Sequence, residues 1–149
     1  MYGLCLRYAC DETEARDILQ DGFVKVFQNL KQFRFQGSFE GWVRRIMVNT
    51  ALERFRKEDH LTASIEEVDF QDPPGYEDVF SELSAQDLLQ MIRDLSPQYR
   101  VVFNLYAIEG YSHKEISQML NISEGTSKSN LSRARSILQE RIKRLNKTG

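Results

Sequence analysis

Residues 111–138, "YSHKEISQMLNISEGTSKSNLSRARSIL", decide the fold class, because they carry the pattern of two helices joined by a tight turn. Ser112 followed by Glu115 is a capping box, in which each residue satisfies a free backbone N–H at a helix start, here of a helix over 113–120. A two-residue turn follows, and Ser123 is a suitable cap for a second helix. The stretch therefore predicts a helix-turn-helix.

The second helix of this motif, expected to run to about residue 145, is stripped of acidic residues at its start. No Asp or Glu occurs over 125–139, although the whole chain carries a formal net charge of −2. At about 100° per residue, one face is expected to enter the core: Ser127, Leu131, Ala134, Leu138 and Leu145. Hydroxyls and cations occupy the other side and the flank: Lys128, Ser129, Ser132, Arg133, Arg135 and Ser136. Because acidic side chains would repel phosphate, this division predicts a helix that reads DNA in the major groove.

The composition is that of an ordinary globular protein, with 149 residues, 41% hydrophobic and 28% charged. This length allows one medium domain or two small ones. No apolar run reaches membrane-spanning length and no signal-peptide pattern is visible, so we expect a cytoplasmic location. Cys5 and Cys10 are interpreted as reduced structural thiols, and neither a metal site nor a cofactor is expected.

Charge is distributed unevenly along the chain. Residues 1–60 hold ten basic and nine acidic residues, residues 61–95 hold one and nine, and residues 96–149 hold nine and four. The acidic middle contains "DPPG", a turn-forming and helix-breaking sequence. We therefore predict two domains, 1–58 and 84–149, joined by an acidic linker over 59–83. The two domains, and not the linker, are expected to contact nucleic acid.

Apolar residues recur at helical spacing almost throughout, and no alternating strand pattern is convincing, so the predicted fold is all-α, with two small helical bundles. Every predicted helix start after the first carries a capping residue: Asp11 with Glu14, Ser38, Ser84 with Asp87, Ser96 before Pro97, Ser112 and Ser123. Helices are predicted over 2–9, 12–30, 39–57, 84–94, from 97, over 113–120 and over 123–145.

The predicted helix over 39–57 has an inward apolar stripe and a second, polar one. Its apolar stripe is Phe39, Trp42, Val43, Ile46, Met47 and Thr50, and its polar stripe is Arg45, Asn49 and Arg56. The preceding loop, "FRFQGSF", interleaves aromatic residues with Arg34 and a glycine, a composition that suits unpaired bases. A simple core role for Phe33, Phe35 and Phe39 is an equally good interpretation.

The predicted helix over 12–30 shows a different kind of surface. Its inward residues are Ala15, Ile18, Leu19, Gly22, Val26 and Leu30. Acids and amides face outward with one valine, and Phe27 lies at the edge; the outward set is Asp17, Gln20, Asp21, Val24 and Gln28. Apolar residues among exposed polar ones indicate a protein-docking face, although single exposed apolar residues are also normal.

Together these segments resemble the extracytoplasmic-function class of bacterial sigma factors, the promoter-specificity subunits of RNA polymerase. "ARDILQDGFVKVFQNLKQFRFQGSFEGWVRRIMVNTALERFRK" is similar to the family's region two. "LSPQYRVVFNLYAIEGYSHKEISQMLNISEGTSKSNLSRARSIL" is similar to its region four. The resemblance covers nearly the whole chain, and the order of the two regions with a linker between them is more specific than the helix-turn-helix alone.

The resemblance implies partners and site residues. It implies docking on the clamp helices of bacterial core RNA polymerase through the outward residues of the 12–30 helix: Asp17, Gln20, Asp21, Val24 and Gln28. It implies contact with the flipped base and the adjacent backbone of the downstream promoter element by Arg34, Phe35, Ser38, Arg45, Asn49, Arg54, Arg56 and Lys57. It assigns the upstream element to Lys128, Ser129, Ser132, Arg133 and Arg135. It also implies restraint by an anti-sigma factor, which in this class is often membrane-anchored.

Two departures from the family pattern lead to further expectations. The family usually has a fuller first helix, so the first bundle is expected to be incomplete at its start. Ser127 stands where the family usually has valine, which predicts looser packing of the recognition helix.

Two other classes of function remain as alternatives to a sigma factor. A helix-turn-helix regulator of the response-regulator output type would need an α/β receiver before its DNA-binding part, and residues 1–60 show no strand pattern. An enzyme would need a catalytic motif, but no zinc-protease, nucleophile-elbow or phosphate-loop motif is present, and no small-molecule substrate is expected. His113 follows a capping serine, so a surface or packing role is favoured over a catalytic one.

Overall fold

The computed structural model of the chain describes residues 1–59 and 84–148, and within these ranges the regular structure is helical, without a strand. The predicted all-α fold is therefore confirmed. The chain divides into two compact units, Met1–Ala63 and Ser64–Gly149. The predicted acidic linker, apart from its first residue, lies outside the described residues.

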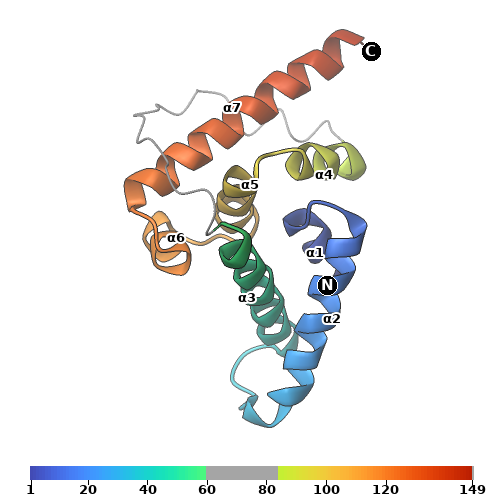
Figure 1. The fold of residues 1–149 in the computed structure, drawn as a ribbon, viewed down its shortest axis with the longest axis vertical. Coiled ribbons are helices and arrows are strands. Elements are labelled where there is room, and N and C mark those ends of the chain that lie inside the picture. The colour runs from blue at the N-terminus through green and yellow to red at the C-terminus, as the bar shows by residue number, and fades with distance from the viewer. Residues whose placement is uncertain (60–83, 149) are drawn as a thin grey trace. The chain divides into compact units, whose positions relative to one another are not determined.

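The first unit contains three α-helices and one short 3₁₀ turn (Figure 1). They are α1 (Tyr2–Tyr8), α2 (Glu12–Gln28), the 3₁₀ turn η1 (Leu30–Gln32) and α3 (Phe39–Asp59). Helices α2 and α3 pack against each other, and α1 packs against both. This arrangement leaves one side of α2 and one side of α3 available for partners.

Side-chain caps begin the two long helices of this unit where the sequence predicts them. The carboxylate of Asp11 accepts a hydrogen bond from the backbone N–H of Glu14 at 2.7 Å. The carboxylate of Glu14 in turn accepts one at 2.7 Å from the backbone N–H of Cys10, the residue before the cap, so the reciprocal bond is shifted by one residue from that of a standard capping box. Ser38 accepts a hydrogen bond from the N–H of Gly41 at 2.9 Å, so the start of α3 is capped as well.

The core of the first unit is formed by α1, α2 and α3, and a glycine lets α2 and α3 approach closely. A Cβ added to Gly22 would lie 2.3 Å from the sulfur of Met47, which is fully buried. Ile18 and Val26 are buried as predicted, but Leu30 is 45% exposed, so its predicted inward position is wrong. The reason is that α2 ends at Gln28 and the chain turns into η1, which takes Leu30 off the buried face.

The second unit has four α-helices, one of which continues into a π-helical segment. They are α4 (Ala85–Arg93), α5 (Pro97–Phe103), the π segment η3 (Asn104–Ile108), α6 (His113–Leu120) and α7 (Glu124–Thr148). Helix α7 packs on α4, α5 and α6. In the π segment, the N–H of Glu109 donates to the carbonyl of Asn104, five residues earlier, at 2.9 Å.

Helices α6 and α7 form the predicted helix-turn-helix. The hydroxyl of Ser112 accepts from the N–H of Glu115 at 3.1 Å, and the hydroxyl of Ser123 accepts from the N–H of Thr126 at 3.0 Å. Between the helices, Asn121 adopts the left-handed conformation with φ 56° and ψ 49°, which reverses the chain in few residues. The motif therefore forms through local capping and turn chemistry.

The buried face of α7 agrees with the predicted stripe at four of its five positions. Ser127, Leu131, Ala134 and Leu138 are all buried, and Ile142 continues the stripe. Leu145 is 44% exposed, which contradicts its predicted core position. Helical periodicity alone places this residue on the stripe, but it does not tell where the neighbouring helices stop covering it.

Candidate functional site

The cations predicted to contact DNA from α7, the second helix of the helix-turn-helix, differ in how far they are exposed. Lys128 is exposed, whereas Arg133 and Arg135 are half-buried because each lies against a tyrosine. The guanidinium of Arg133 donates a hydrogen bond to the hydroxyl oxygen of Tyr99 at 3.1 Å. The guanidinium carbon of Arg135 lies 5.6 Å from the ring centre of Tyr106, within cation–π range.

Two serines predicted to face the groove are instead buried. Ser129 is 7% exposed and Ser132 is 4% exposed, so the prediction that they present free hydroxyls is wrong. The hydroxyl of Ser129 donates to the carbonyl of Gly125 at 3.0 Å, one turn earlier in the same helix. Short hydroxyl side chains often bond back to their own helix in this way, which leaves them close to the backbone. Their assignment to DNA contact stays a prediction.

A polar contact links the two helices of the motif. Nδ1 of His113, at the start of α6, lies 2.8 Å from the hydroxyl of Ser127, which is fully buried in α7. The imidazole also stacks on the ring of Tyr106, with ring centres 4.4 Å apart and planes inclined by 16°. The buried serine thus has a hydrogen-bonding partner across the interface, and the looser packing expected at Ser127 stays a prediction. The contact also gives His113 a packing role.

The loop between η1 and α3 exposes an aromatic side chain in an unusual backbone conformation. Phe35 is 88% exposed and has φ 56°, a left-handed value that is uncommon for a bulky residue. Its ring centre lies 5.0 Å from that of Phe33, which also packs against Phe39 and Trp42 at 5.4 Å each. The core interpretation is therefore wrong for Phe35, while Phe33 is the centre of a supporting aromatic cluster. Arg34 and Ser38, on the same loop, are both exposed.

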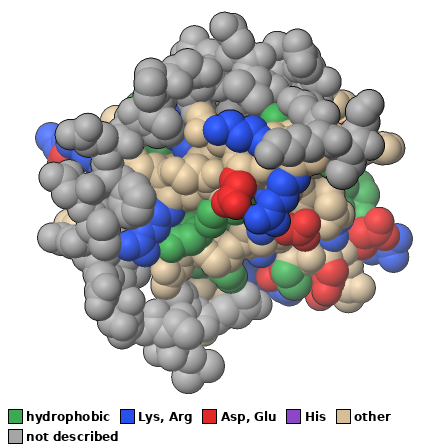
Figure 2. All heavy atoms as spheres, turned by 90° about the horizontal axis from the view of Figure 1, so that it is seen from above, with side chains coloured by type: hydrophobic (Ala, Val, Ile, Leu, Met, Phe, Trp, Pro, Cys, Tyr) green, Lys and Arg blue, Asp and Glu red, His purple; other side chains and the backbone are tan. Residues whose placement is uncertain are grey.

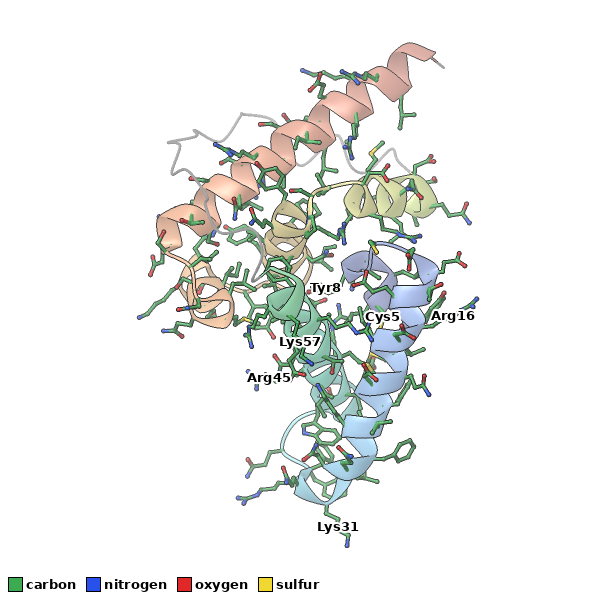
Figure 3. All side chains as sticks on the ribbon, in the orientation of Figure 1. Cys5, Tyr8, Arg16, Lys31, Arg45 and Lys57 are labelled. Atoms are coloured by element: carbon green, nitrogen blue, oxygen red, sulfur yellow. The ribbon has the colours of Figure 1, made fainter. Side chains whose placement is uncertain are left out.

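One side of α3 carries the predicted polar stripe. Arg45, Asn49 and Arg56 are all exposed, at spacings of four and seven residues that place them along one face of the helix. Arg45 lies on the side of α3 that faces away from α2 in Figure 3. An amide and two cations aligned in this way can contact a phosphate backbone and the edge of a base.

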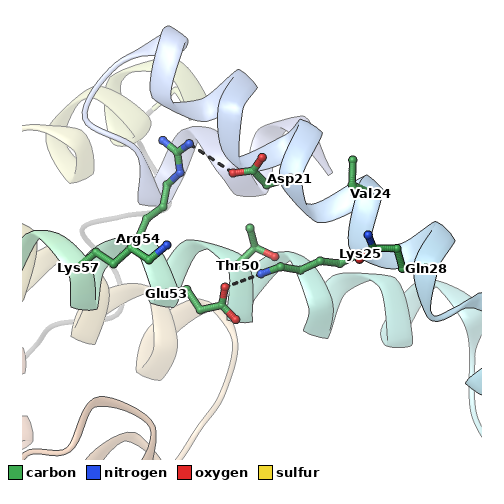
Figure 4. Close-up of a pocket in the computed structure, with 8 residues that line it drawn as sticks. All are labelled: Asp21, Val24, Lys25, Gln28, Thr50, Glu53, Arg54 and Lys57. Carbon is green, nitrogen blue, oxygen red and sulfur yellow. Dashed lines mark hydrogen bonds and ion pairs between the residues drawn. The ribbon is translucent and has the colours of Figure 1, made fainter.

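Two other cations of α3, Arg54 and Lys57, line a groove against α2. This groove has a volume of about 500 Å³ and is lined by Asp21, Val24, Lys25, Gln28, Thr50, Glu53, Arg54 and Lys57 (Figure 4). Arg54 pairs with Asp21 at 3.3 Å and with Asp17 at 3.8 Å, and Lys25 pairs with Glu53. The cations of α3 predicted for downstream DNA contact thus fall into two groups. Arg45 and Arg56 lie on the polar stripe, whereas Arg54 and Lys57 lie beside the residues predicted to dock on polymerase.

Helix α2 exposes apolar side chains next to these ion pairs. Val24 is 49% exposed and Phe27 is 74% exposed, as the predicted docking face requires. Phe23, which the sequence analysis did not single out, is 39% exposed. Asp17, Gln20, Asp21 and Gln28 are exposed as predicted. An apolar strip bordered by acids and amides is a surface suited to another protein.

The described residues contain no cluster of His, Cys, Asp and Glu able to hold a metal ion, and no helix among them is long and apolar enough to cross a membrane. Both cysteines are free. Burial raises the pKa of the Cys5 thiol, and the hydrogen bond to Glu14 is the main cause that raises the pKa of the exposed Cys10 thiol to about 11. Neither thiol is therefore activated as a nucleophile.

Acidic and basic side chains are interspersed on the surface of the described residues, although they are distributed unevenly along the chain. In the face shown in Figure 2, Lys and Arg side chains stand beside Asp and Glu over the described part of the molecule. The exposed ion pairs Arg54–Asp21 and Lys25–Glu53 are examples of this mixing. Such a surface offers DNA local cationic contacts more than a broad positive field.

Two family models match the chain. Residues 1–61 match Sigma-70 region 2, and residues 85–138 match Sigma-70, region 4. The first match covers α1 to α3, including the aromatic loop. The second covers α4 to α6 and the part of α7 that carries Lys128, Arg133 and Arg135.

Two curated proteins are similar to the chain over nearly its whole length. The ECF RNA polymerase sigma factor SigE of Mycolicibacterium smegmatis is 30% identical over 146 residues, which are 94% of this chain and 56% of the relative. The ECF RNA polymerase sigma factor SigW of Bacillus subtilis is 30% identical over 157 residues, which are 97% of this chain and 84% of the relative. The chain thus spans about half the length of SigE and most of SigW.

One solved structure has a similar fold. It is the sigma factor RpoE from Bartonella quintana, in complex with the anti-sigma factor NepR, with a TM-score of 0.60 and 24% sequence identity. The match covers 95% of this chain and 89% of the other. At this identity the likeness describes the fold.

Proposed function

Because the chain belongs to the extracytoplasmic-function family of RNA polymerase sigma factors, we propose that it binds bacterial core RNA polymerase and directs it to a set of promoters. Members of this family act in transcription initiation and are not enzymes. The observation that carries the proposal is the combination of a capped helix-turn-helix with a separate helical unit that exposes Phe35 beside a line of polar residues on α3.

The helix-turn-helix is proposed to read the upstream promoter element as closed duplex. Lys128 is exposed near the start of α7 and suits a phosphate contact, whereas Arg133 can offer a planar guanidinium to a guanine edge. Arg135 lies at the flank of the helix, where it suits the backbone. Ser129 and Ser132 belong to the same proposed surface, but contact requires that they become accessible.

The first unit is proposed to hold unpaired bases of the downstream element. Phe35 offers an open aromatic face for stacking, which is worth about 1–3 kcal/mol per base. Extruding a base from the duplex costs a few kcal/mol, so the balance is close and contacts made by the polymerase are needed to favour the open state. Arg34 and Ser38 would border the base, and Arg45, Asn49 and Arg56 would follow the adjacent strand.

The exposed side of α2 is proposed to dock on the polymerase clamp helices through Asp17, Gln20, Asp21, Val24 and Gln28. The mixture of carboxylates and an exposed valine supports a partner surface that is basic and partly apolar. Arg54 and Lys57, predicted to contact DNA, line the same groove as Asp21, predicted to contact the polymerase. We therefore expect polymerase docking and DNA binding at this groove to influence each other.

Regulation by an anti-sigma factor and a cytoplasmic location are part of the same proposal. The solved relative RpoE is bound to the anti-sigma factor NepR, and the present chain has the same fold. We therefore propose a protein antagonist that covers the exposed surfaces of this chain. A membrane-anchored antagonist is one form that such a partner takes in this family.

The proposal is tested by adding the purified full chain to bacterial core RNA polymerase and sequencing the transcripts from a genomic DNA template. We expect new transcript starts that share two upstream sequence elements and that vanish when the chain is left out. A chain that fails to bind core polymerase, or that leaves the pattern of transcript starts unchanged, would contradict the proposed function.

Asn49 provides a specific test of the downstream contact. Asn49→Ala should reduce promoter opening, measured by permanganate reactivity of unpaired thymines, while binding to core polymerase stays unchanged. Asn49 is exposed on α3, so the substitution should not lower the temperature of unfolding. Loss of core binding in this variant would instead indicate that the residue belongs to the docking surface.

The response-regulator alternative is not favoured, because the part of the chain that would form a receiver is helical. Residues 1–59 contain α1, α2, η1 and α3 and no strand, and residues 1–61 match Sigma-70 region 2. A receiver domain is built around a parallel sheet. The helix-turn-helix of the second unit therefore follows a sigma region 2 and not a receiver domain.

A further inference from the structure

Tyr99 holds a cation of the recognition helix from a neighbouring helix. It lies in α5, which packs against α7, and its hydroxyl oxygen accepts a hydrogen bond from the guanidinium of Arg133 at 3.1 Å. The two residues are 34 positions apart in the sequence, so the contact exists only in the folded unit. The pair is partly buried, which strengthens the bond relative to one in open water.

An arginine that reads a base must hold its guanidinium group in a defined orientation. Its long side chain can adopt many conformations, and each hydrogen bond to DNA requires that most of them be given up. A neighbour that already restrains the guanidinium reduces this entropic cost before DNA arrives. The bond to Tyr99 uses one N–H group of the guanidinium, which has five in a fixed plane.

We propose that Tyr99 is a positioning and specificity-determining residue, which orients Arg133 toward one base pair of the upstream promoter element. The inference rests on the proposed function of α7 in reading that element. Tyr99 itself touches no base, and it acts through Arg133. The partner that this arrangement fits is a guanine edge in the major groove, since guanine presents two acceptors to a planar guanidinium.

The hydroxyl of Tyr99 can be removed without removing its ring. Tyr99→Phe deletes the acceptor for Arg133 and keeps the aromatic ring. Tyr111→Phe is a matched control, because it makes the same chemical change in the same unit. The contact described for Tyr111 is made by its backbone N–H, which donates to the carbonyl of Leu105 at 2.9 Å.

The experiment uses the full chain with core RNA polymerase and a DNA library in which the upstream element is randomised. Sequencing of transcripts gives the base preference at each position for wild type, Tyr99→Phe, Tyr111→Phe and Arg133→Ala. Arg133→Ala should abolish the preference at one position, and Tyr99→Phe should reduce it there by about threefold to tenfold. Tyr111→Phe should match wild type, and the unfolding temperature should report any general loss of structure.

A double variant separates positioning from folding. On the Arg133→Ala background, Tyr99→Phe should have no further effect on base preference, because the side chain it orients is gone. An unchanged or sharpened preference in Tyr99→Phe would overturn the inference while wild type still directs initiation. A loss spread equally over all positions would also overturn it. If wild type selected no starts at all, both the proposed function and this inference would fail.

Discussion

Ser127 occupies a position where an apolar side chain would be the ordinary choice, and its surroundings compensate for the hydroxyl. It is fully buried, and the hydroxyl lies 2.8 Å from Nδ1 of His113 on the preceding helix. A buried polar group without a partner destabilises a fold by about 1–3 kcal/mol. The hydrogen bond to His113 avoids this cost for the hydroxyl of Ser127. The identity of residue 113 therefore matters for the way α6 and α7 meet.

The His113–Ser127 contact predicts a dependence of one residue on the other. Ser127→Ala should lower the free energy of unfolding by about 1–3 kcal/mol, since it takes a buried partner away from the imidazole. His113→Phe should lower it too, and the double variant should lose less than the sum of the two. Urea unfolding followed by circular dichroism measures these values, and simple additivity would argue against a direct interaction.

Cys10 illustrates how a capping interaction alters the chemistry of an exposed side chain. The neighbouring carboxylate of Glu14 raises the pKa of the thiol to about 11, above the ordinary value of 9.0. In a folded chain at pH 8, the reactive thiolate is therefore rarer than in an unfolded one. A thiol whose pKa is raised on folding stabilises the fold below pH 9, and this contribution is lost as the pH rises toward 11.

Alkylation rates provide the corresponding prediction. Cys10 in the native chain should react with iodoacetamide more slowly at pH 8 than a free cysteine, and Glu14→Gln should speed the reaction by lowering the thiol pKa. Mass spectrometry of tryptic peptides distinguishes Cys10 from buried Cys5, which serves as the internal reference. Equal rates before and after the Glu14 change would contradict the assigned cause.

At the scale of elements, helix starts could be predicted because they depend on neighbouring residues. Asp11, Ser38, Ser84, Ser112 and Ser123 each accept a backbone hydrogen bond at a helix start, as expected. Ser96 also precedes a helix with proline at its first position, but without a side-chain cap. Local chemistry of this kind is encoded within four residues and needs no tertiary information.

Other features could not be predicted from local patterns. The Tyr99–Arg133 hydrogen bond joins residues 34 positions apart, and neither the π segment nor the left-handed conformation of Phe35 is indicated by the spacing of apolar residues. Periodicity does not show where a helix ends or where its neighbours stop covering it, which explains the wrong positions of Leu30, beyond the end of α2, and of Leu145. At the candidate site, the long cations were placed on the correct helix, while the burial of Ser129 and Ser132 was missed.

The contact between α2 and α3 leads to a prediction about helix packing. Gly22→Ala would bring a methyl group against the buried Met47 side chain, and overpacking typically costs about 1–3 kcal/mol. The expected result is a lower free energy of unfolding, although alanine favours a helix more than glycine does. Gly3→Ala is the control, because a Cβ at that helical position meets no atom within 4 Å. A stabilised Gly22→Ala variant would show that Met47 can move aside.

Across the whole molecule, the balance of charge limits what the chain can bind alone. A net charge of −2, with ion pairs such as Arg54–Asp21 on the surface, leaves little general attraction for DNA. The exposed cations predicted to contact DNA, such as Arg45 and Lys128, are distributed over both units. Promoter binding is therefore expected to depend on the polymerase, which brings both units to the DNA at the same time.

Salt dependence tests this expectation directly. The free chain should bind a random duplex weakly, with a dissociation constant on the order of 10⁻⁴–10⁻⁶ M at physiological salt and a shallow slope against salt concentration. Fluorescence anisotropy over a series of salt concentrations measures both quantities. Tight binding of the free chain, with a steep slope, would mean that many more phosphate contacts form than the exposed cations on α3 and α7 provide.

The π segment Asn104–Ile108 has a consequence for natural variation in this part of the chain. A π turn is one residue longer than the α turn it replaces, so deleting a single residue there would restore ordinary helical geometry. Such a deletion would rotate Tyr106 by about a quarter turn relative to α5 and separate it from the imidazole of His113 and the guanidinium of Arg135. Relatives that are one residue shorter at this point should therefore carry different side chains at all three positions.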